Sequence, residues 1–156
     1  GEQLVANNSE TDGVSLRYFN VFGHRQDPNS QYAAVVSSFK NALQQNLPPV
    51  IYGDGTQTRD FTAVENVVHA NLLAASHPEP LCGALFNIGT GTSMSLNKLV
   101  RTMANEEVIP VLYQEARKGD VQHSQADITA ASRVLGYSPI VDTTSALQTL
   151  LSPIQQ

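Results

Sequence analysis

The stretch VSLRYFNVFGHRQDP, residues 14–28, joins an apolar strand to a polar loop. Residues 14–19 are rich in β-branched and aromatic side chains and follow an Asp-Gly pair, which favours a β-strand. Their almost continuous apolar character is typical of a buried parallel strand. Asn20 follows at once, and a charged loop occupies residues 24–27. A polar amide and a charged loop at the end of an apolar strand predict a bound ligand at this point.

Helical and strand patterns alternate along the rest of the chain. We expect Val67, Val68, Leu72 and Ala75 to share one face of a helix, Ser95 to cap another helix, and Gly136 to end a third. The first helix has no cap, so the chain is expected to begin in mid-domain. The predicted helices cover 1–8, 33–46, 64–76, 96–103, 127–135 and 144–151, and the predicted strands cover 14–19, 50–52, 59–61, 85–88 and 110–114. The pattern predicts a mixed α/β piece without a complete sheet.

Composition limits the classes of function. The 156 residues fit one domain, and an apolar fraction of 41% is enough for a core. The net charge of −5 argues against nonspecific nucleic-acid binding, which needs a basic face. No apolar run reaches the about 18 residues of a membrane span, and no secretory leader opens the chain. The single cysteine, Cys82, forms no internal disulfide, so a cytoplasmic location is expected.

Several catalytic and metal-binding arrangements are not supported. The four histidines lack zinc-type spacing, so no metal site is expected. Asp120, His123 and Ser124 are triad residue types, but sequence neighbours rarely reach triad geometry. The GTGT turn at 89–92 lacks the third glycine of a dinucleotide fingerprint and is expected to be a turn that needs positive φ. The chain therefore carries no predicted catalytic residue.

Four motifs in order, LRYFNVFGHRQDPN, YGDGTQTRDF, FNIGTGTSMSL and RKGDVQHSQADI, resemble nucleotide-sugar epimerases and dehydratases of the extended short-chain dehydrogenase/reductase family. The likeness is greatest to UDP-N-acetylglucosamine 4-epimerases. It implies an α/β chain that is the C-terminal substrate-binding part, includes the last strand or strands of the Rossmann sheet, and lacks most of the NAD-binding Rossmann domain. Residues 1–30 would be a Rossmann remnant, and residues 31–156 the nucleotide-sugar-binding subdomain.

The resemblance implies an NAD-dependent 4-epimerase acting on UDP-N-acetylglucosamine, UDP-N-acetylgalactosamine or UDP-glucose. The reaction inverts C4 through a 4-keto intermediate and would serve polysaccharide biosynthesis. The Gly-rich turn, the Ser/Thr and the Tyr-x-x-x-Lys pair of the family are absent from these 156 residues. This chain alone is therefore expected to be inactive, with NAD bound mainly by the missing Rossmann half, which is its expected partner along with the UDP-sugar.

The resemblance also implies a role for individual residues. Asn20 would bond the pyrophosphate or sugar, Arg59 would clamp the diphosphate, and Asp60 is expected to be structural. Further substrate contacts are expected from Ala34 and Val35 as small residues near the substrate, Val50 and Tyr52 at the uracil, Leu96 as an apolar wall, and Arg117 and Asp120 at phosphate and ribose. On the cofactor side, Tyr18 and Phe19 would line the nicotinamide part of the cleft.

Ser124 would determine the room near the sugar's C2 substituent. A tyrosine there would exclude an N-acetyl group, whereas a serine leaves space, so the resemblance implies acceptance of N-acetylated UDP-sugars. Alternatives stay open at this point. The chain fits a related nucleotide-sugar 4,6-dehydratase or decarboxylase half, a non-catalytic nucleotide-sugar-binding module, or an α/β fragment that self-associates. The sequence leaves a homo-oligomer open as well.

Overall fold

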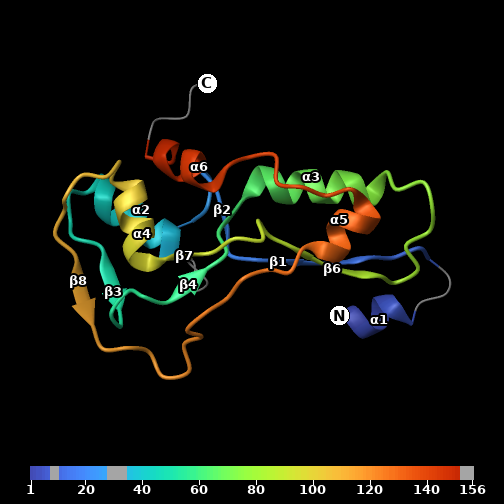
Figure 1. The fold of residues 1–156 in the computed structure, drawn as a ribbon, viewed down its shortest axis with the longest axis horizontal. Helices are drawn as coiled ribbons and strands as arrows, with labels where there is room; N and C mark the ends of the chain where they lie inside the picture. The colour runs from blue at the N-terminus through green and yellow to red at the C-terminus, as the bar shows by residue number, and fades with distance from the viewer. Residues whose placement is uncertain (8–10, 28–34, 152–156) are drawn as a thin grey trace.

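The computed structural model of the chain describes residues 1–7, 11–27 and 35–151. Short helices and strands alternate, and Figure 1 shows them spread along one long axis. The helices are α1 (Glu2–Ala6), α2 (Val35–Gln44), α3 (Val64–Ala75), α4 (Leu96–Met103), α5 (Thr129–Leu135) and α6 (Thr143–Thr149). The strands are β1 (Ser15–Tyr18), β2 (Val21–Phe22), β3 (Val50–Tyr52), β4 (Thr58–Arg59), β5 (Thr62–Ala63), β6 (Leu85–Ile88), β7 (Met94–Ser95) and β8 (Leu112–Gln114). Among these described helices, none has the length and apolar character needed to cross a membrane.

The first core lies around the parallel pair of β1 and β6. Their register aligns Ser15 with Leu85 and Tyr18 with Ile88, and the chain crosses between the two strands through α3, as a parallel connection requires. α5 packs against both β6 and α3. The buried residues of this core are Ala70, Leu81, Phe86, Ile88, Ala131, Leu135 and Tyr137. The strand predicted over 14–19 is therefore confirmed as a parallel strand.

β1 is less buried than predicted. Arg17 and Tyr18 are exposed, because among the described residues β6 is the only strand that pairs with β1. The expected domain boundary between residues 30 and 31 lies outside the described residues. The β1–β6 pair joins segments from both sides of that boundary.

The second core lies where α2, α4 and α6 meet, at the other end of the molecule from α5 (Figure 1). Large side chains from all three helices are fully enclosed there, including Phe39, Leu99, Met103 and Leu147. The strands near this core form three small ladders. β2 pairs with β5 and β3 with β8 in parallel, and β4 pairs with β7 in antiparallel fashion. The segment 58–63 supplies both β4 and β5, so it links the β4–β7 and β2–β5 ladders.

α3 is a helix as predicted, but the apolar residues predicted to share one of its faces are not equally buried. Val68 and Leu72 are 53% and 63% exposed, whereas Asn66, Val67 and Ala70 are buried. The reason is that the Asn66 side chain bonds the backbone at residues 140 and 141, at distances of 2.8–2.9 Å. This polar anchor turns a different stripe of the helix inward.

The predicted helix ends are mostly confirmed. The Ser95 hydroxyl accepts a hydrogen bond from the Lys98 amide at 3.2 Å, and Gly136 ends α5 with φ of +67°. The helix predicted to begin at residue 127 begins at Thr129, because the Asp127 carboxylate accepts from the Thr129 amide before the helix starts. Two-residue strands such as β2, β5 and β7 were not predicted, since they are too short to give an alternating pattern.

Candidate functional site

A cavity of about 620 Å³ lies between the start of α2, β3, β4, the start of α4 and the loop at 117–120. Strands, helix starts and a loop from separate parts of the chain meet here, as is usual for ligand sites in α/β proteins. Eight of the ten predicted substrate-binding residues line it: Asn20, Val35, Val50, Tyr52, Arg59, Leu96, Arg117 and Asp120. The structure thus brings most of the set together, while the role of each residue stays a prediction.

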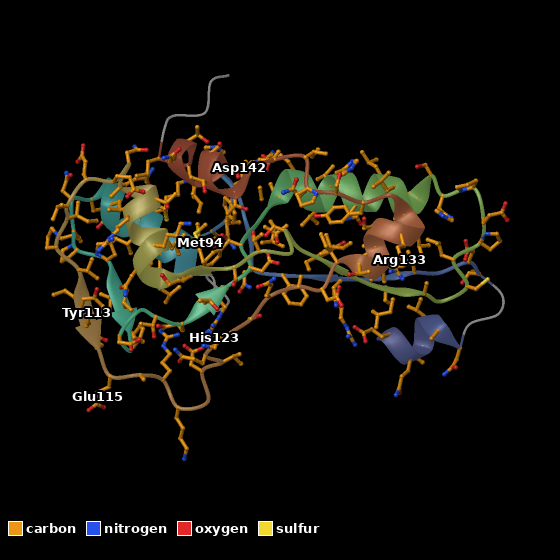
Figure 2. All side chains as sticks on the ribbon, in the orientation of Figure 1. Met94, Tyr113, Glu115, His123, Arg133 and Asp142 are labelled. Carbon is orange, nitrogen blue, oxygen red and sulfur yellow. The ribbon has the colours of Figure 1, made fainter. Side chains whose placement is uncertain are left out.

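Strand alternation explains how one short segment serves this cavity. Gln57, Arg59 and Phe61 all line it, whereas Thr58 and Asp60 contact the opposite side. Successive side chains of an extended chain point to opposite faces, so every second residue faces the cavity. On the far side the Thr58 hydroxyl lies 3.1 Å from Nδ1 of His123, whose position is shown in Figure 2.

Cationic side chains gather in the cavity. Arg59 forms an ion pair with Asp120, and its Nη1 donates to the Thr58 carbonyl at 2.8 Å. The side chain of Arg59 is only 16% exposed, so its guanidinium is held in one orientation. Arg117 and Lys118 lie on the loop that carries Asp120. The described lining therefore holds three cationic side chains and one carboxylate, an excess of positive charge suited to an anion.

Asn20 lies where β1 passes into β2. Its φ is +32°, in a region that few residues other than glycine and asparagine adopt. The Asn20 side-chain amide donates to the Asp60 carbonyl at 3.1 Å, and the Asn20 carbonyl accepts from the Thr62 amide at 3.3 Å. These bonds fix the strained residue against the strand that carries Arg59.

Three of the predicted residues that the structure describes are not among those that line the cavity. Ser124 is half-buried beside β4, where its amide donates to the Thr58 carbonyl at 3.1 Å. Tyr18 and Phe19 lie at the end of β1, and the Tyr18 hydroxyl bonds Asn71 of α3. Ala34 lies outside the described residues.

The prediction missed five further lining residues: Ser38, Gln57, Phe61, Lys118 and Gly119. Gln57 and Phe61 have a signal in the sequence, because they stand two positions either side of Arg59 in an extended segment. Ser38 stands three positions after Val35 on α2, hence on the same helical face. Gln57 also closes the cavity wall, since its side-chain amide donates to the Tyr52 carbonyl at 2.6 Å.

The GTGT turn binds a carboxylate of its own chain. The Thr90 amide and hydroxyl donate to one oxygen of Asp60 at 2.9 and 2.7 Å, and the Gly91 amide donates to the other at 3.0 Å. Gly91 has φ of +73°, which confirms the expected positive-φ turn. These amides are therefore not free to hold the diphosphate of a dinucleotide. Asp60 is fully buried, as a structural residue is expected to be.

Tyr137 closes the same turn from the other side. Its buried hydroxyl donates to the Gly89 carbonyl at 2.8 Å. Burial, with a further contribution from the negative charge of Asp60, raises the pKa of Tyr137 to about 12. The phenol therefore stays protonated at any physiological pH and keeps its hydrogen bond.

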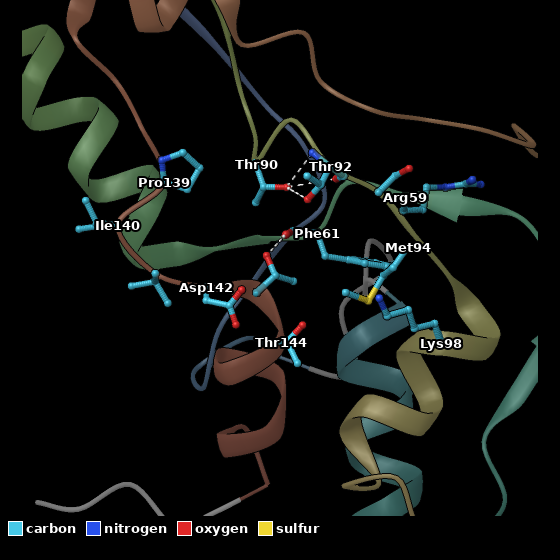
Figure 3. A pocket seen from close by; sticks show the side chains of 13 residues that line it. Arg59, Phe61, Thr90, Thr92, Met94, Lys98, Pro139, Ile140, Asp142 and Thr144 are labelled. Atoms are coloured by element: carbon cyan, nitrogen blue, oxygen red, sulfur yellow. Dashed lines mark hydrogen bonds between the residues drawn. The ribbon is translucent and has the colours of Figure 1, made fainter.

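A second cavity, of about 590 Å³, shares Arg59 and Phe61 with the first (Figure 3). Its walls are Thr90, Thr92, Met94, Lys98 and the segment 139–144. Among the described residues of the predicted substrate-binding set, Arg59 alone lines this second cavity. Over 1–7, 11–27 and 35–151, no cluster of His, Cys, Asp or Glu is arranged to hold a metal ion.

Comparison with known proteins assigns the family. The sequence profile described as the NAD dependent epimerase/dehydratase family matches residues 1–89, more than half of the chain. The chain belongs to this family. The expected relation to nucleotide-sugar epimerases of the extended short-chain dehydrogenase/reductase type is thereby confirmed, and so is a partial α/β chain of that fold.

Members of the NAD dependent epimerase/dehydratase family with assigned activities are similar over most of this chain. UDP-glucose 4-epimerase of Mycolicibacterium smegmatis is 38% identical over 124 residues, which are 78% of this chain and 39% of that protein. The structure of UDP-N-acetylglucosamine 4-epimerase from Methanobrevibacter ruminantium M1 in complex with UDP-N-acetylmuramic acid has a TM-score of 0.84 and 38% identity, covering 96% of this chain and 48% of that one. UDP-glucuronic acid 4-epimerase from Bacillus cereus, in complex with UDP-glucuronic acid and NAD, has a TM-score of 0.82 and 27% identity, covering 96% and 47%. The chain spans less than half the length of each relative.

Proposed function

We propose that this chain is the substrate-binding portion of an NAD-dependent 4-epimerase of UDP-N-acetylglucosamine, UDP-N-acetylgalactosamine and UDP-glucose. One observation carries the proposal: a single cavity is lined both by cationic side chains and by apolar and aromatic ones. The cationic residues are Arg59, Arg117 and Lys118. A nucleoside diphosphate needs this combination, because its phosphates are anionic and the flat faces of its base pack against apolar and aromatic side chains.

Each part of the nucleotide has a matching wall. Arg59 and Arg117 would bind the diphosphate, for which a planar guanidinium offers paired donors. Val50, Tyr52 and Leu96 would hold the uracil, and the Asp120 carboxylate would accept from the ribose hydroxyls. Asp120 pairs with Arg59 in this structure, so the bound nucleotide would replace the ion pair with phosphate and hydroxyl contacts. Binding of the nucleotide would hold the sugar while its C4 reacts.

NAD would be bound mainly by parts of the enzyme outside these residues. The amides of Thr90 and Gly91 are occupied by Asp60, so this chain would contribute only Tyr18 and Phe19, at the nicotinamide side. NAD supplies hydride removal and return at the sugar's C4, and this chain supplies binding and orientation. The chain alone is accordingly proposed to be inactive.

The remaining expectations stay proposals of the same kind. Residues 1–30 would belong to the Rossmann part, whose last strands would include β1, and residues 31–156 to the substrate-binding subdomain. We also propose a cytoplasmic location and a role in polysaccharide biosynthesis. The acceptance of an N-acetyl group at the sugar's C2 is a proposal as well.

The test is a calorimetric titration of the chain with UDP-N-acetylglucosamine, UDP-glucose, UDP and NAD. We expect saturable binding of the UDP compounds and no response to NAD. Arg59→Ala should abolish the binding, whereas Arg133→Ala, the same substitution at an exposed site on α5, should leave it unchanged. A folded chain that binds none of the UDP compounds would contradict the proposal for this chain.

A further inference from the structure

Asp60 is a fully buried carboxylate that contacts two segments distant in sequence. Its oxygens accept from the turn at Thr90 and Gly91, and from the amide of Ala126 at 3.1 Å. Its own carbonyl accepts from Asn20. Four hydrogen bonds to the carboxylate, three of them from backbone amides, compensate for the loss of water around the charge.

One of these contacts, with Ala126, leads to residues of the proposed substrate site. The amide of Ala126 belongs to the segment that carries Asp120 and Ser124. That segment is joined to β4 by two further backbone bonds, from the Thr58 amide to the Gln122 carbonyl and from the Ser124 amide to the Thr58 carbonyl. The Asp60–Ala126 bond continues the same row, and Arg59 stands next to it in the strand.

We propose that Asp60 is a positioning residue for nucleotide-sugar binding: its carboxylate ties the segment 120–126 and the turn at 89–91 to the strand that presents Arg59. The proposal rests on the proposed function of the cavity. It assigns to Asp60 no contact with substrate. Its carboxylate acts through Arg59 and Asp120, whose relative positions it holds.

The position requires a carboxylate. All four donors point at its two oxygens, two at each, so an asparagine amide would place its own N–H groups against N–H or O–H donors on one side. Space is equally restricted, because a Cβ atom on Gly89 would come within 2.8 Å of the Asp60 carboxylate and 2.5 Å of the Ala126 side chain. Neither a longer side chain nor an amide satisfies this site.

The chain offers a matched control in Asn66. It is as deeply buried as Asp60 and also fixes a distant segment, through three hydrogen bonds at residues 140 and 141. That segment lines the second cavity and not the first. Asn66→Ala should therefore lower the melting temperature as Asp60→Asn does, without affecting the proposed substrate cavity.

The experiment measures affinity and amide exchange in the same variants of the full chain. We expect Asp60→Asn to weaken binding of UDP-N-acetylglucosamine by about tenfold or more, and Asn66→Ala to leave it within about twofold of wild type. By NMR, the amides of Thr58 and Ser124 should exchange faster in Asp60→Asn but not in Asn66→Ala. Thr90→Val, which removes only the hydroxyl donor, should show a smaller effect in the same direction.

The outcomes separate the two proposals. If Asp60→Asn and Asn66→Ala weaken binding equally, or Asp60→Asn binds as wild type, the positioning role is wrong. If the wild-type chain binds no UDP-sugar, the proposed function fails, and amide exchange alone decides the role of Asp60. In that case, unchanged amide exchange at Thr58 and Ser124 in Asp60→Asn would overturn the positioning role of Asp60. If Asp60→Asn does not fold, Thr90→Val gives the same two readouts.

Discussion

The guanidinium carbon of Arg117 lies 3.9 Å from the centre of the Tyr52 ring, so the cation covers one face of the aromatic side chain. Both residues line the proposed substrate cavity. The contact holds an otherwise exposed arginine over β3, because the ring's negative face attracts the cation. It also connects the proposed uracil wall to a proposed phosphate ligand.

Arg117→Ala should therefore weaken UDP binding by about tenfold, the usual effect of losing a charged hydrogen bond, with little change in stability. Arg117→Lys should restore only part of the affinity, since a lysine keeps the charge but lacks the flat surface that stacks on Tyr52. Titration calorimetry measures both. Arg133→Ala, on α5 at the other end of the molecule from α2 and β3 (Figures 1 and 2), is the control. Equal affinity for wild type and Arg117→Ala would remove Arg117 from the site.

Ser124→Tyr should alter the choice of sugar. We expect the complete enzyme to lose UDP-N-acetylglucosamine and UDP-N-acetylgalactosamine while UDP-glucose is retained, because the larger ring occupies the room proposed for the N-acetyl group. Ser124→Ala, which adds no bulk, should keep both kinds of substrate. Turnover of each UDP-sugar is compared between variants. A parallel loss of all substrates would mean that Ser124 contributes to the structure and not to selectivity.

Tyr137 should make stability fall in strong alkali. Its pKa is raised to about 12 in the folded chain, against 10.0 ordinarily, so the unfolded chain loses this proton first. The contribution is fully present below pH 10 and disappears as the pH rises toward about 12. Urea unfolding of wild type and Tyr137→Phe should show a stability difference that shrinks over this range. At pH 7 the variant should be about 1–2 kcal/mol less stable, because the Gly89 carbonyl loses its donor. A difference that stays constant with pH would contradict this assignment.

Asp142 should have the opposite pH dependence. The amide and then the hydroxyl of Ser145 donate to its carboxylate at the start of α6, which lowers the pKa of Asp142 below its ordinary 3.8. Its stabilising effect is present above that ordinary value and is lost as the pH falls through the lowered pKa. Asp142→Ala should cost about 1 kcal/mol near neutral pH and little in strong acid. Asparagine also caps a helix but does not titrate, so Asp142→Asn should keep most of the stability both near neutral pH and in strong acid. Thermal unfolding at the two pH values decides the matter.

Local signals in the sequence predicted the elements well. Ser95 and Gly136 mark helix ends by their own chemistry, so they were found without knowledge of the fold. The inward face of α3 was not predictable in this way. Asn66 is polar and would be expected at the surface. Its burial is explained only by its hydrogen bonds to the distant backbone at residues 140 and 141.

The site was predictable only through the resemblance. Nothing local indicates that Asn20, Arg59 and Asp120 meet, because they are far apart in sequence and come together through the small ladders at the centre of the chain. The cavity nevertheless contains most of the predicted set. The unpredicted Gln57 and Phe61 follow from the extended form of the segment around Arg59, once that form is known.

The alternation of residues 57–61 has a consequence for insertions and deletions. A slip of this strand by one residue would place Arg59 among amide donors and Asp60 in the proposed phosphate cavity. Arg59 would then meet N–H donors like its own, and the Asp60 carboxylate would take the place of phosphate among the cationic side chains, so the error would damage folding and ligand recognition at once. The turn at 53–56 sets this alignment. It should therefore tolerate amino-acid substitutions far better than insertions or deletions.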